Sequence, residues 1–371
     1  MSKLPKTRQD LIDMYIKSLE EGNIPWEQMW KTSIPENAIS GIKYRGVNNL
    51  YLSYIAYKRG YKDNRWITFN QMGKKHWKFI GSAKGKGVPV EWWAMKNKKD
   101  NKIISFEEYN KIIEENPEKE KEFKISKMSY TVFNGDLVDG LVNDKTEQKQ
   151  EIISNDYIQN IIDNIGVGYK EEGEDAYYSP SKDIVVLPPS NTFKTSNSYY
   201  ATQLHELAHS TGHESRLSRN MKDHFGTEGY AKEELRAEIS SSFLMQKFHL
   251  EEDKRHLDNH KSYVKNWLEI LKNNPQELFN AITDANKIVD YLEENIKRFK
   301  QIHKYLDKMN SAKKDSQREY FKQYTEMYFE KGETFDNIAE IEQEYINAFN
   351  VRKAKIDNLY NEIKIIKKLK V

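Results

Sequence analysis

The sequence predicts a protein of the α+β class. Three observations support this prediction: amphipathic helical patterns recur along the chain, short strand patterns bounded by Gly and Pro lie between them, and 371 residues suffice for two domains with their own cores. We expect a small α+β N-terminal domain over residues 1–142, a mainly helical second domain with a short sheet over residues 151–300, and a long helical extension over residues 301–371.

In the N-terminal domain, residues 9–20 predict an amphipathic helix that turns side chains such as Leu11 inward and ends at Gly22. Strand-forming residues then predict short strands around residues 66–69, 88–93 and 128–133. Mixed charges with little apolar content indicate that residues 97–127 are a solvated insertion. The polar run over residues 141–150 predicts the linker to the second domain.

A helix over residues 152–165 is expected to open the second domain. The run 183–187, between Pro180 and Pro188, predicts a short strand at a sheet edge, where an extended peptide could pair with its free backbone groups. Apolar residues at three- and four-residue steps over residues 338–369 predict a long helix that docks on another helix, of the same chain or of a second copy. Further amphipathic helices are expected over residues 197–207, 231–244, 263–271 and 281–299.

The sequence His205-Glu206-Leu207-Ala208-His209 carries the strongest chemical signal. On a helix, residues four apart are neighbours, so both imidazoles can reach one metal ion while Glu206 lies beside them as a general base toward water. This geometry is typical of zinc hydrolases. The structural alternative is an amphipathic helix whose histidines are satisfied core groups.

A catalytic zinc ion usually has three protein ligands, so a third must be found. His213 is close in sequence but follows the expected helix end, and Ser215 stands where a longer histidine motif would have its third histidine. Glu234 and Glu238 share one face of the predicted helix over residues 231–244. We therefore expect Glu234 as the third ligand and Glu238 as the group that holds a ligand histidine by its free ring N–H. The alternative is an ordinary solvated Glu-rich face.

Aromatic and basic residues interleave between residues 44 and 93. Single-stranded DNA binding needs rings that stack on bases and cations that follow phosphates. The net charge of only +2 requires a local basic patch for such binding. The alternative is that the rings form core and the lysines only solubilise the surface. The residues expected to contact DNA are Tyr44, Arg45, Trp66, Lys74, Lys75, Trp77, Lys84, Lys86 and Trp92.

Several of these motifs together resemble the ArdC antirestriction family of mobile elements. The resemblance spans about residues 8–297, and its motifs occur in the family's order over residues 24–26, 44–48, 66–71, 132–134, 199–213, 216–219 and 230–238. It implies an N-terminal single-strand DNA-binding domain joined to a zincin-like metallopeptidase domain. It also implies an association with plasmids, conjugative elements or phages, where the protein protects incoming DNA from restriction.

The predicted function is therefore antirestriction by a protein that binds single-stranded DNA and carries a zinc peptidase site. One zinc ion per chain, or manganese or cobalt, would be held by His205, His209 and Glu234, and Glu206 would take the proton of water. The protein substrate is not identified. In the alternative, the protein only coats DNA and its metal site is structural or vestigial. A metal-dependent nuclease has less support, because no cluster of Asp and Glu suggests two adjacent metals. The candidates for stabilising the tetrahedral oxyanion are Tyr230, His213 and His224.

The chain contains no cysteine, no secretion-type apolar segment at its N-terminus and no apolar run long enough to span a bilayer. We expect a soluble cytoplasmic protein without membrane contacts. The sequence does not indicate an oligomeric state.

Overall fold

The computed structural model describes residues 5–25, 33–141, 161, 165–221, 223, 226–248, 250 and 261–311. For Lys261, Ser262 and residues 295–311 it describes the backbone alone. The chain forms two units, one of residues 1–158 with 167–290 and one of residues 159–166 with 291–371. The predictions that lie outside the described residues concern His224, the linker after Leu141, most of the helix over residues 152–165 and the helix over residues 338–369.

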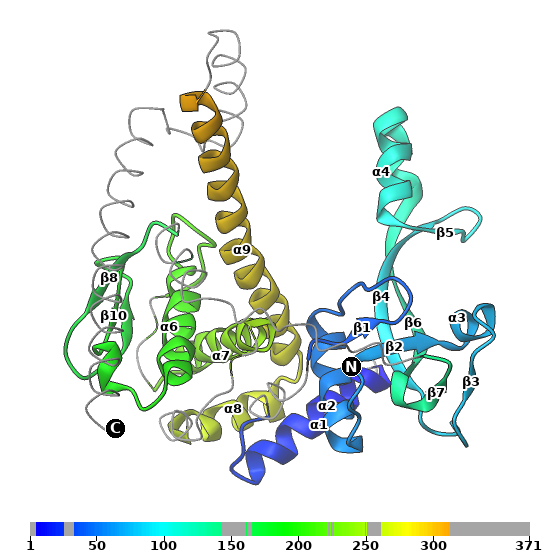
Figure 1. Ribbon diagram of the computed structural model, residues 1–371, viewed down its shortest axis with the longest axis horizontal. Coiled ribbons are helices and arrows are strands. Elements are labelled where there is room, and N and C mark those ends of the chain that lie inside the picture. The colour runs from blue at the N-terminus through cyan, green and yellow to red at the C-terminus, as the bar shows by residue number, and fades with distance from the viewer. Residues whose placement is uncertain are drawn as a thin grey trace, which may run out of the picture. The chain divides into compact units, whose positions relative to one another are not determined.

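The N-terminal part of the first unit is built on a five-stranded sheet with the order β1-β2-β6-β4-β5 (Figure 1). β1 runs parallel to β2, and the other neighbours are antiparallel. The predicted strands exist, which agrees with the α+β class. A second, two-stranded sheet pairs β3 (Lys78–Phe79) with β7 (Val138–Asp139). The strands of the larger sheet are β1 (Glu36–Asn37), β2 (Arg65–Thr68), β4 (Val88–Asn97), β5 (Ile103–Ile104) and β6 (Phe123–Asn134).

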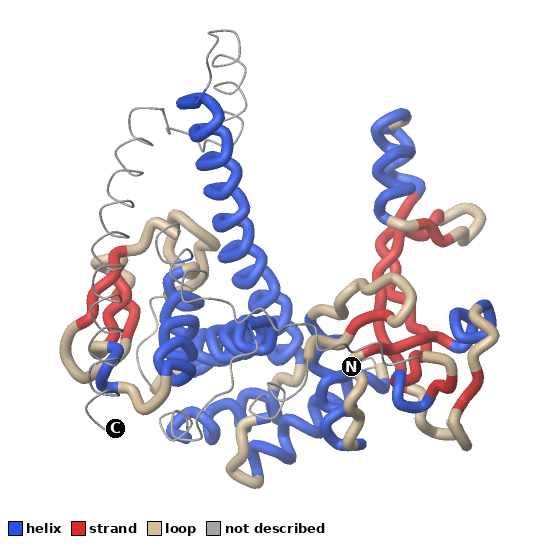
Figure 2. The backbone as a smooth tube through the Cα atoms, in the orientation of Figure 1, coloured by secondary structure: helices blue, strands red, loops and turns tan. Residues whose placement is uncertain are grey.

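β4 and β6 are longer than the sequence pattern indicated. They pair with each other from Val88 and Val132 out to Asn97 and Phe123, whereas β2 reaches only the end of β6 nearest residue 134. The two strands therefore continue past the rest of the sheet as an arm (Figure 2). At its end lie α4 (Phe106–Glu115) and a 3-10 helix (Pro117–Glu122).

The predicted solvated insertion over residues 97–127 is thus partly wrong. α4 has no buried residue, as a solvated segment should, but the residues on either side of it pair into the sheet. The few apolar residues of the segment are enough to close a small core of Met95, Ile104 and Phe123, against which Tyr109 of α4 packs.

Three helices accompany this sheet: α1 (Lys6–Glu20), α2 (Gly46–Arg59) and α3 (Phe69–Lys74). α1 agrees with the first predicted helix, but α2 was not predicted. Gly46 opens α2 with φ +55°, and a Cβ at this position would lie 2.9 Å from the side-chain nitrogen of Asn286. The positive φ favours glycine at this position.

Among the described residues, the second part of the first unit contains three long helices, the start of a fourth that continues past residue 290, and a small sheet. The helices are α6 (Ser196–Ser210), α7 (Glu228–Phe248), α8 (Lys261–Asn273) and α9 (Gln276–Ser311). α6, α7 and α8 begin and end within four residues of the predicted ranges, whereas α9 begins five residues before and ends twelve residues after the range predicted for it. No helix of the described part of the chain is both long and apolar enough to cross a bilayer.

The predicted edge strand over residues 183–187 is instead the central strand of its sheet. β10 (Ile184–Leu187) runs parallel to β8 (Gly168–Glu171) and antiparallel to β9 (Tyr177–Ser179), in the order β8-β10-β9. The flanking prolines suggested an edge, but both lie outside the paired residues and cost no ladder hydrogen bond. The edges of this sheet are β8 and β9.

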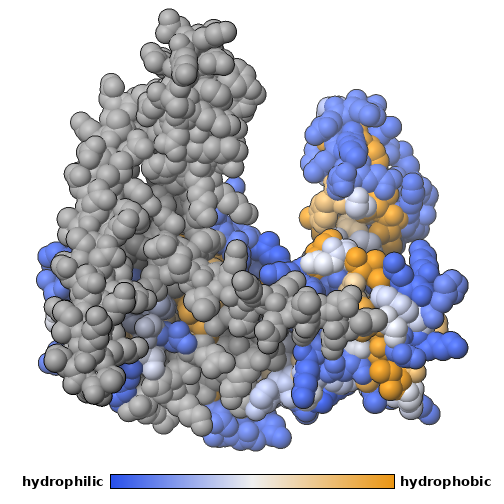
Figure 3. Space-filling model, in the orientation of Figure 1, coloured by the Kyte–Doolittle hydropathy of each residue, from blue (hydrophilic) through white to orange (hydrophobic). Residues whose placement is uncertain are grey.

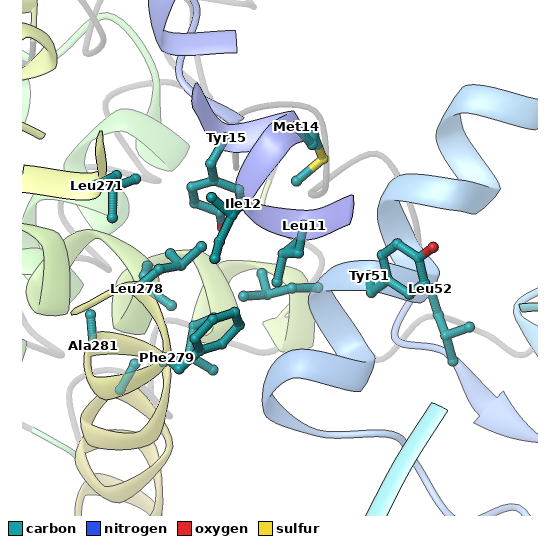
Figure 4. Packing of buried hydrophobic residues seen from close by; sticks show 14 of the residues in the cluster. Leu11, Ile12, Met14, Tyr15, Tyr51, Leu52, Leu271, Leu278, Phe279 and Ala281 are labelled. Carbon is teal, nitrogen blue, oxygen red and sulfur yellow. The ribbon is translucent and has the colours of Figure 1, made fainter. Parts of the chain in front are cut away.

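One hydrophobic core joins the N-terminal helices to the helices of the second part. Leu11 and Tyr15 of α1, both fully buried, belong to the same cluster as Leu278 and Phe279 of α9 (Figure 4). α7 and α8 enter this cluster too, and the indole N–H of the fully buried Trp267 donates to the carbonyl of Ala231 across 2.9 Å. The helix that carries the acidic residues of the candidate site is therefore packed against the N-terminal half.

Candidate metal centre and nucleic-acid surface

α6 carries the histidine motif, and the motif lies in the interior of the protein. Thr195 caps the start of the helix, because its hydroxyl accepts a hydrogen bond from the backbone N–H of Ser198. Leu204 and Leu207 are fully buried and fix the helix against its neighbours. His205, Glu206 and His209 are each no more than 8% exposed, so their chemistry takes place in a partly desolvated environment.

The two histidines and Glu234 converge on one point between α6 and α7. Their ligand atoms all lie within 4.8 Å of one another. The Nε2 atoms of His205 and His209 are 3.1 Å apart, and the Glu234 carboxylate oxygens lie 3.5 Å from the first and 3.4 Å from the second. Tetrahedral zinc with bonds of about 2.0–2.1 Å needs ligand atoms about 3.3 Å apart. The donor set and its spacing therefore fit a zinc ion.

The second ring nitrogen of each histidine faces another carboxylate of α7. Nδ1 of His205 lies 3.3 Å from Glu238, the residue expected to hold a ligand histidine. Nδ1 of His209 lies 3.4 Å from Glu233, which was not predicted to take part. A carboxylate at Nδ1 favours the tautomer with its proton there and leaves Nε2 free to bind a metal.

Charge and burial oppose each other in this centre. Burial raises the pKa of Glu206, the carboxylate that follows His205. Burial alone would also raise the pKa of Glu234, but the two imidazoles outweigh it and hold that pKa well below its usual value. Burial alone would lower the pKa of His209, but the charge of Glu234 and the hydrogen bond to Glu233 hold it well above its usual value. Burial and the neighbouring groups together therefore decide which of these side chains carries a charge.

The centre opens into a cavity of about 980 Å³. His205, Glu206, His209 and Glu234 line it, together with two tyrosines from other helices, Tyr230 of α7 and Tyr263 of α8. The edge strand β9 borders the same cavity. His213 is not among the lining residues, and its Nδ1 lies 2.8 Å from the hydroxyl of Ser215.

Two of the nine residues expected to contact DNA lie in the core. Trp66 is fully buried and Tyr44 is 9% exposed, and both belong to the large hydrophobic cluster. Neither ring can stack on a base, because the fold would have to open first. Trp77 is half-buried and packs against Met72 and Val138. For these three residues the structure agrees with the alternative interpretation, in which the aromatic residues of this segment belong to the hydrophobic core.

The remaining residues of that prediction are exposed. Lys74 and Lys75 end α3, Lys84 and Lys86 lie in the loop before β4, and Trp92 is 38% exposed on β4. Arg45 is exposed and forms a salt bridge with Asp290.

A second set of rings, outside the nine residues predicted to contact DNA, lies close to these lysines. The ring centroids of Phe79 and Phe133 are 4.8 Å apart, and those of Phe79 and Phe69 are 6.2 Å apart. Phe69 is 63% exposed. A Cβ on Gly87 would lie 3.2 Å from the Phe133 ring, so the lysine-bearing loop passes beside these rings. Figure 3 shows apolar surface near β7 and over the β4–β6 arm, surrounded by hydrophilic surface.

Comparisons with known proteins agree with the fold. Residues 5–133 match the family model of the N-terminal domain of the anti-restriction factor ArdC, and residues 156–284 match that of a zincin-like metallopeptidase. The metal-free crystal structure of the antirestriction ArdC protein from the R388 plasmid is 29% identical, with a TM-score of 0.62 over 79% of this chain and 98% of that one. Its Mn(II)-bound structure is 30% identical, with a TM-score of 0.60 over 78% of this chain and 97% of that one.

The fold and the buried His-His-Glu set thus belong to a chain with a zincin-like metallopeptidase domain. The chain is a member of the ArdC family of antirestriction proteins. Among curated proteins it is 34% identical over 290 residues to a DNA primase TraC from Escherichia coli, and 32% identical over 296 residues to a second one. It covers only 19% and 27% of the lengths of these two relatives.

Proposed function

We propose that this antirestriction protein hydrolyses peptide bonds at a zinc site of His205, His209 and Glu234, and that its N-terminal part binds single-stranded DNA. The observation that carries the peptidase proposal is the arrangement of both histidines, with each Nε2 near Glu234 and each Nδ1 near a further carboxylate. The glutamates of a solvated helix face would not be buried beside two histidines in this way. Histidines that bind a metal ion, by contrast, usually have a carboxylate at the second ring nitrogen.

Each residue of the site has a defined task in this proposal. A divalent metal ion bound there would supply Lewis-acid chemistry that acidifies water and polarises the scissile carbonyl. Glu206 accepts a proton from the attacking water and passes it to the leaving amine nitrogen. Its raised pKa suits this task, because a base with a pKa closer to neutrality also returns the proton readily.

Tyr230 is the best of the three candidates for stabilising the oxyanion. It lines the cavity and its phenol interacts with Glu234, whereas His213 bonds to Ser215 and His224 lies outside the described residues. Burial and the nearby Glu234 charge raise the pKa of Tyr230. Its hydroxyl therefore stays protonated and can donate a hydrogen bond to an oxyanion.

The cavity suits a peptide better than a nucleic acid. The edge strand β9 borders it, and an edge strand can pair with an extended peptide backbone. Its lining includes the carboxylates of Glu174, Asp175 and Asp223, whereas Lys194 is the one lysine or arginine among the described residues that line it. This charge balance repels phosphate groups and argues against the nuclease alternative.

The proposed DNA surface combines the rings of Phe69, Phe79 and Phe133 with exposed lysines of α3 and of the loop before β4. Rings that are partly exposed can stack on bases, and nearby ammonium groups can follow the phosphates. The lysines concerned are Lys74, Lys75, Lys84 and Lys86.

The test of the peptidase proposal is the hydrolysis of a mixed set of fluorogenic peptides by zinc-loaded protein. Glu206→Gln keeps the size of the side chain but removes the base, and we expect a loss of about 100- to 10,000-fold in rate. Glu228→Gln is the control, because it makes the same substitution at an exposed glutamate, which lies at the start of α7 and pairs with Lys232. Equal rates for wild type and Glu206→Gln would refute the proposed mechanism.

A further inference from the structure

An arginine from the loop after α6 holds the carboxylate that faces His209. Nε of Arg219 donates to one oxygen of Glu233 across 3.0 Å, and Nη2 donates to the other oxygen across 2.6 Å. Both side chains are about one-tenth exposed. A two-pronged contact of this kind fixes a carboxylate in position and in rotation, which a single hydrogen bond does not.

The same guanidinium also forms hydrogen bonds with the C-terminal end of α6. Nη1 donates to the hydroxyl of Thr211 across 2.7 Å, and Nη2 donates to the carbonyl of Ala208 across 2.9 Å. Arg219 is therefore hydrogen-bonded both to α6, which carries the two histidines, and to α7, which carries the glutamates of the site. A Cβ on Gly212 would lie 3.1 Å from Nη2, so a glycine at this position leaves room for the guanidinium.

We propose that Arg219, acting through Glu233, is a positioning residue of the metal centre that orients the His209 imidazole for binding a metal ion. The inference rests on the proposed metal site. Arg219 fixes Glu233, and Glu233 lies 3.4 Å from Nδ1 of His209. The Nδ1 proton then points at Glu233, and the Nε2 lone pair points at the site shared with His205 and Glu234.

A second arginine of the same loop gives a matched control. Arg216 donates to the carbonyl of Ser210 across 2.7 Å and pairs with Asp183 next to β10. Its side chain is buried, bonded to the end of α6 and paired with a carboxylate, as that of Arg219 is, but its partner Asp183 is not one of the carboxylates beside His205 and His209. Arg216→Lys and Arg219→Lys therefore remove comparable contacts from one loop, and only Arg219→Lys should affect the metal centre.

The test measures metal binding itself. The Zn²⁺ affinity of the full chain is determined by competition with a chromophoric chelator, and the absorption spectrum of the Co²⁺-loaded protein reports the geometry of the ligands. For Arg219→Lys and for Glu233→Gln we expect the Zn²⁺ dissociation constant to rise about 10- to 100-fold and the Co²⁺ spectrum to change. The double variant should lose little more than either single variant, because both residues act in one chain of contacts.

Two results would overturn the inference: unchanged affinity and spectrum in Glu233→Gln, or an equal loss of affinity in Arg216→Lys. Glu233→Gln keeps the volume of the side chain, so it carries the test even if Arg219→Lys does not fold. A wild-type protein that binds neither Zn²⁺ nor Co²⁺ would overturn the proposed metal site together with the inference. A wild type that binds zinc, with a Glu233→Gln variant of the same affinity, would overturn the inference alone.

Discussion

The side-chain amide of Asn49 in α2 donates a hydrogen bond across 2.9 Å to the side-chain oxygen Oε1 of Gln246 in α7, and both residues are buried. Gln246 in turn donates to the hydroxyl of Ser53, one turn further along α2. α7 therefore carries the acidic residues of the candidate metal site near its start and is fastened to the N-terminal half near its end. A buried polar network of this kind specifies one arrangement of its two helices.

This connection predicts that the two halves of the first unit do not fold separately. Removal of residues 1–142 would strip α1 and α2 from Leu278 and Phe279, and would leave Gln246 without its partner in α2. We expect the full chain to show one cooperative thermal transition for this unit, and the shortened chain to aggregate or to unfold without a transition. Circular dichroism during heating measures both. A shortened chain that melts cooperatively near the temperature of the full chain would contradict the prediction.

The aromatic residues of the N-terminal half are predicted to divide into two functional groups. Phe79→Ala should weaken binding of a labelled single-stranded oligonucleotide by about 1–3 kcal/mol for the lost stack. Phe106→Ala is the control, because Phe106 is an exposed ring on α4, away from this surface. Trp66→Ala should instead destabilise the protein by about 3–5 kcal/mol, because Trp66 is fully buried.

Anisotropy titrations and denaturant melts separate these effects. If Phe79→Ala and Phe106→Ala bind the oligonucleotide equally well, the proposed surface is wrong. Raising the salt concentration should also weaken binding of the wild type, and Lys74→Gln should reduce that salt dependence.

Tyr230→Phe tests the role of the phenol in the cavity. The substitution keeps the ring near Tyr263 but removes the hydroxyl that we expect to stabilise the oxyanion. We predict a lower kcat for peptide hydrolysis, by about 100- to 1,000-fold, with little change in KM and with zinc content retained. A change in KM alone would assign Tyr230 to substrate binding and contradict the proposed role.

Metal removal should separate the two proposed activities. The proposed metal ligands lie on α6 and α7, whereas the rings and lysines of the proposed DNA surface lie on α3, β3, β6 and the loop before β4. We therefore expect a chelator to abolish peptide hydrolysis while the circular dichroism spectrum and the binding of single-stranded DNA stay the same. Loss of DNA binding together with the metal would mean that the site has a structural role.

The sequence predicts the metal-site residues where the signal is local. The four-residue spacing of His205 and His209 defines a shared helix face without any knowledge of the fold. Glu234 and Glu238 are likewise one turn apart on a single helix. The contact of Glu233 with His209 could not be predicted in this way, because it depends on how α7 packs on α6 and on Arg219, a residue outside both helices.

The predictions that fail depend on contacts between distant parts of the chain. The strand at residues 184–187 was expected at an edge, but Gly168 and Ser179 both pair with Ile184. Trp66 was expected at the surface because basic residues surround it in sequence, but it lies on β2 in the core. Local composition does not indicate which side of a strand faces the core when both sides carry rings.

The α+β class and the resemblance to the ArdC family are confirmed. The domain boundaries expected at residues 142 and 300 stay predictions, as does the extension over residues 301–371.

The metal content of purified protein tests the central claim most directly. Elemental analysis of the wild type should find about one zinc ion per chain, and both His205→Ala and Glu234→Ala should lose it, because each variant removes one of the three ligands. Glu228→Ala, which changes an exposed glutamate of the same helix, should keep the metal. Zinc retained by Glu234→Ala at the wild-type level would contradict the proposed site, and a wild type that binds no metal would contradict the account of the protein as a metallopeptidase.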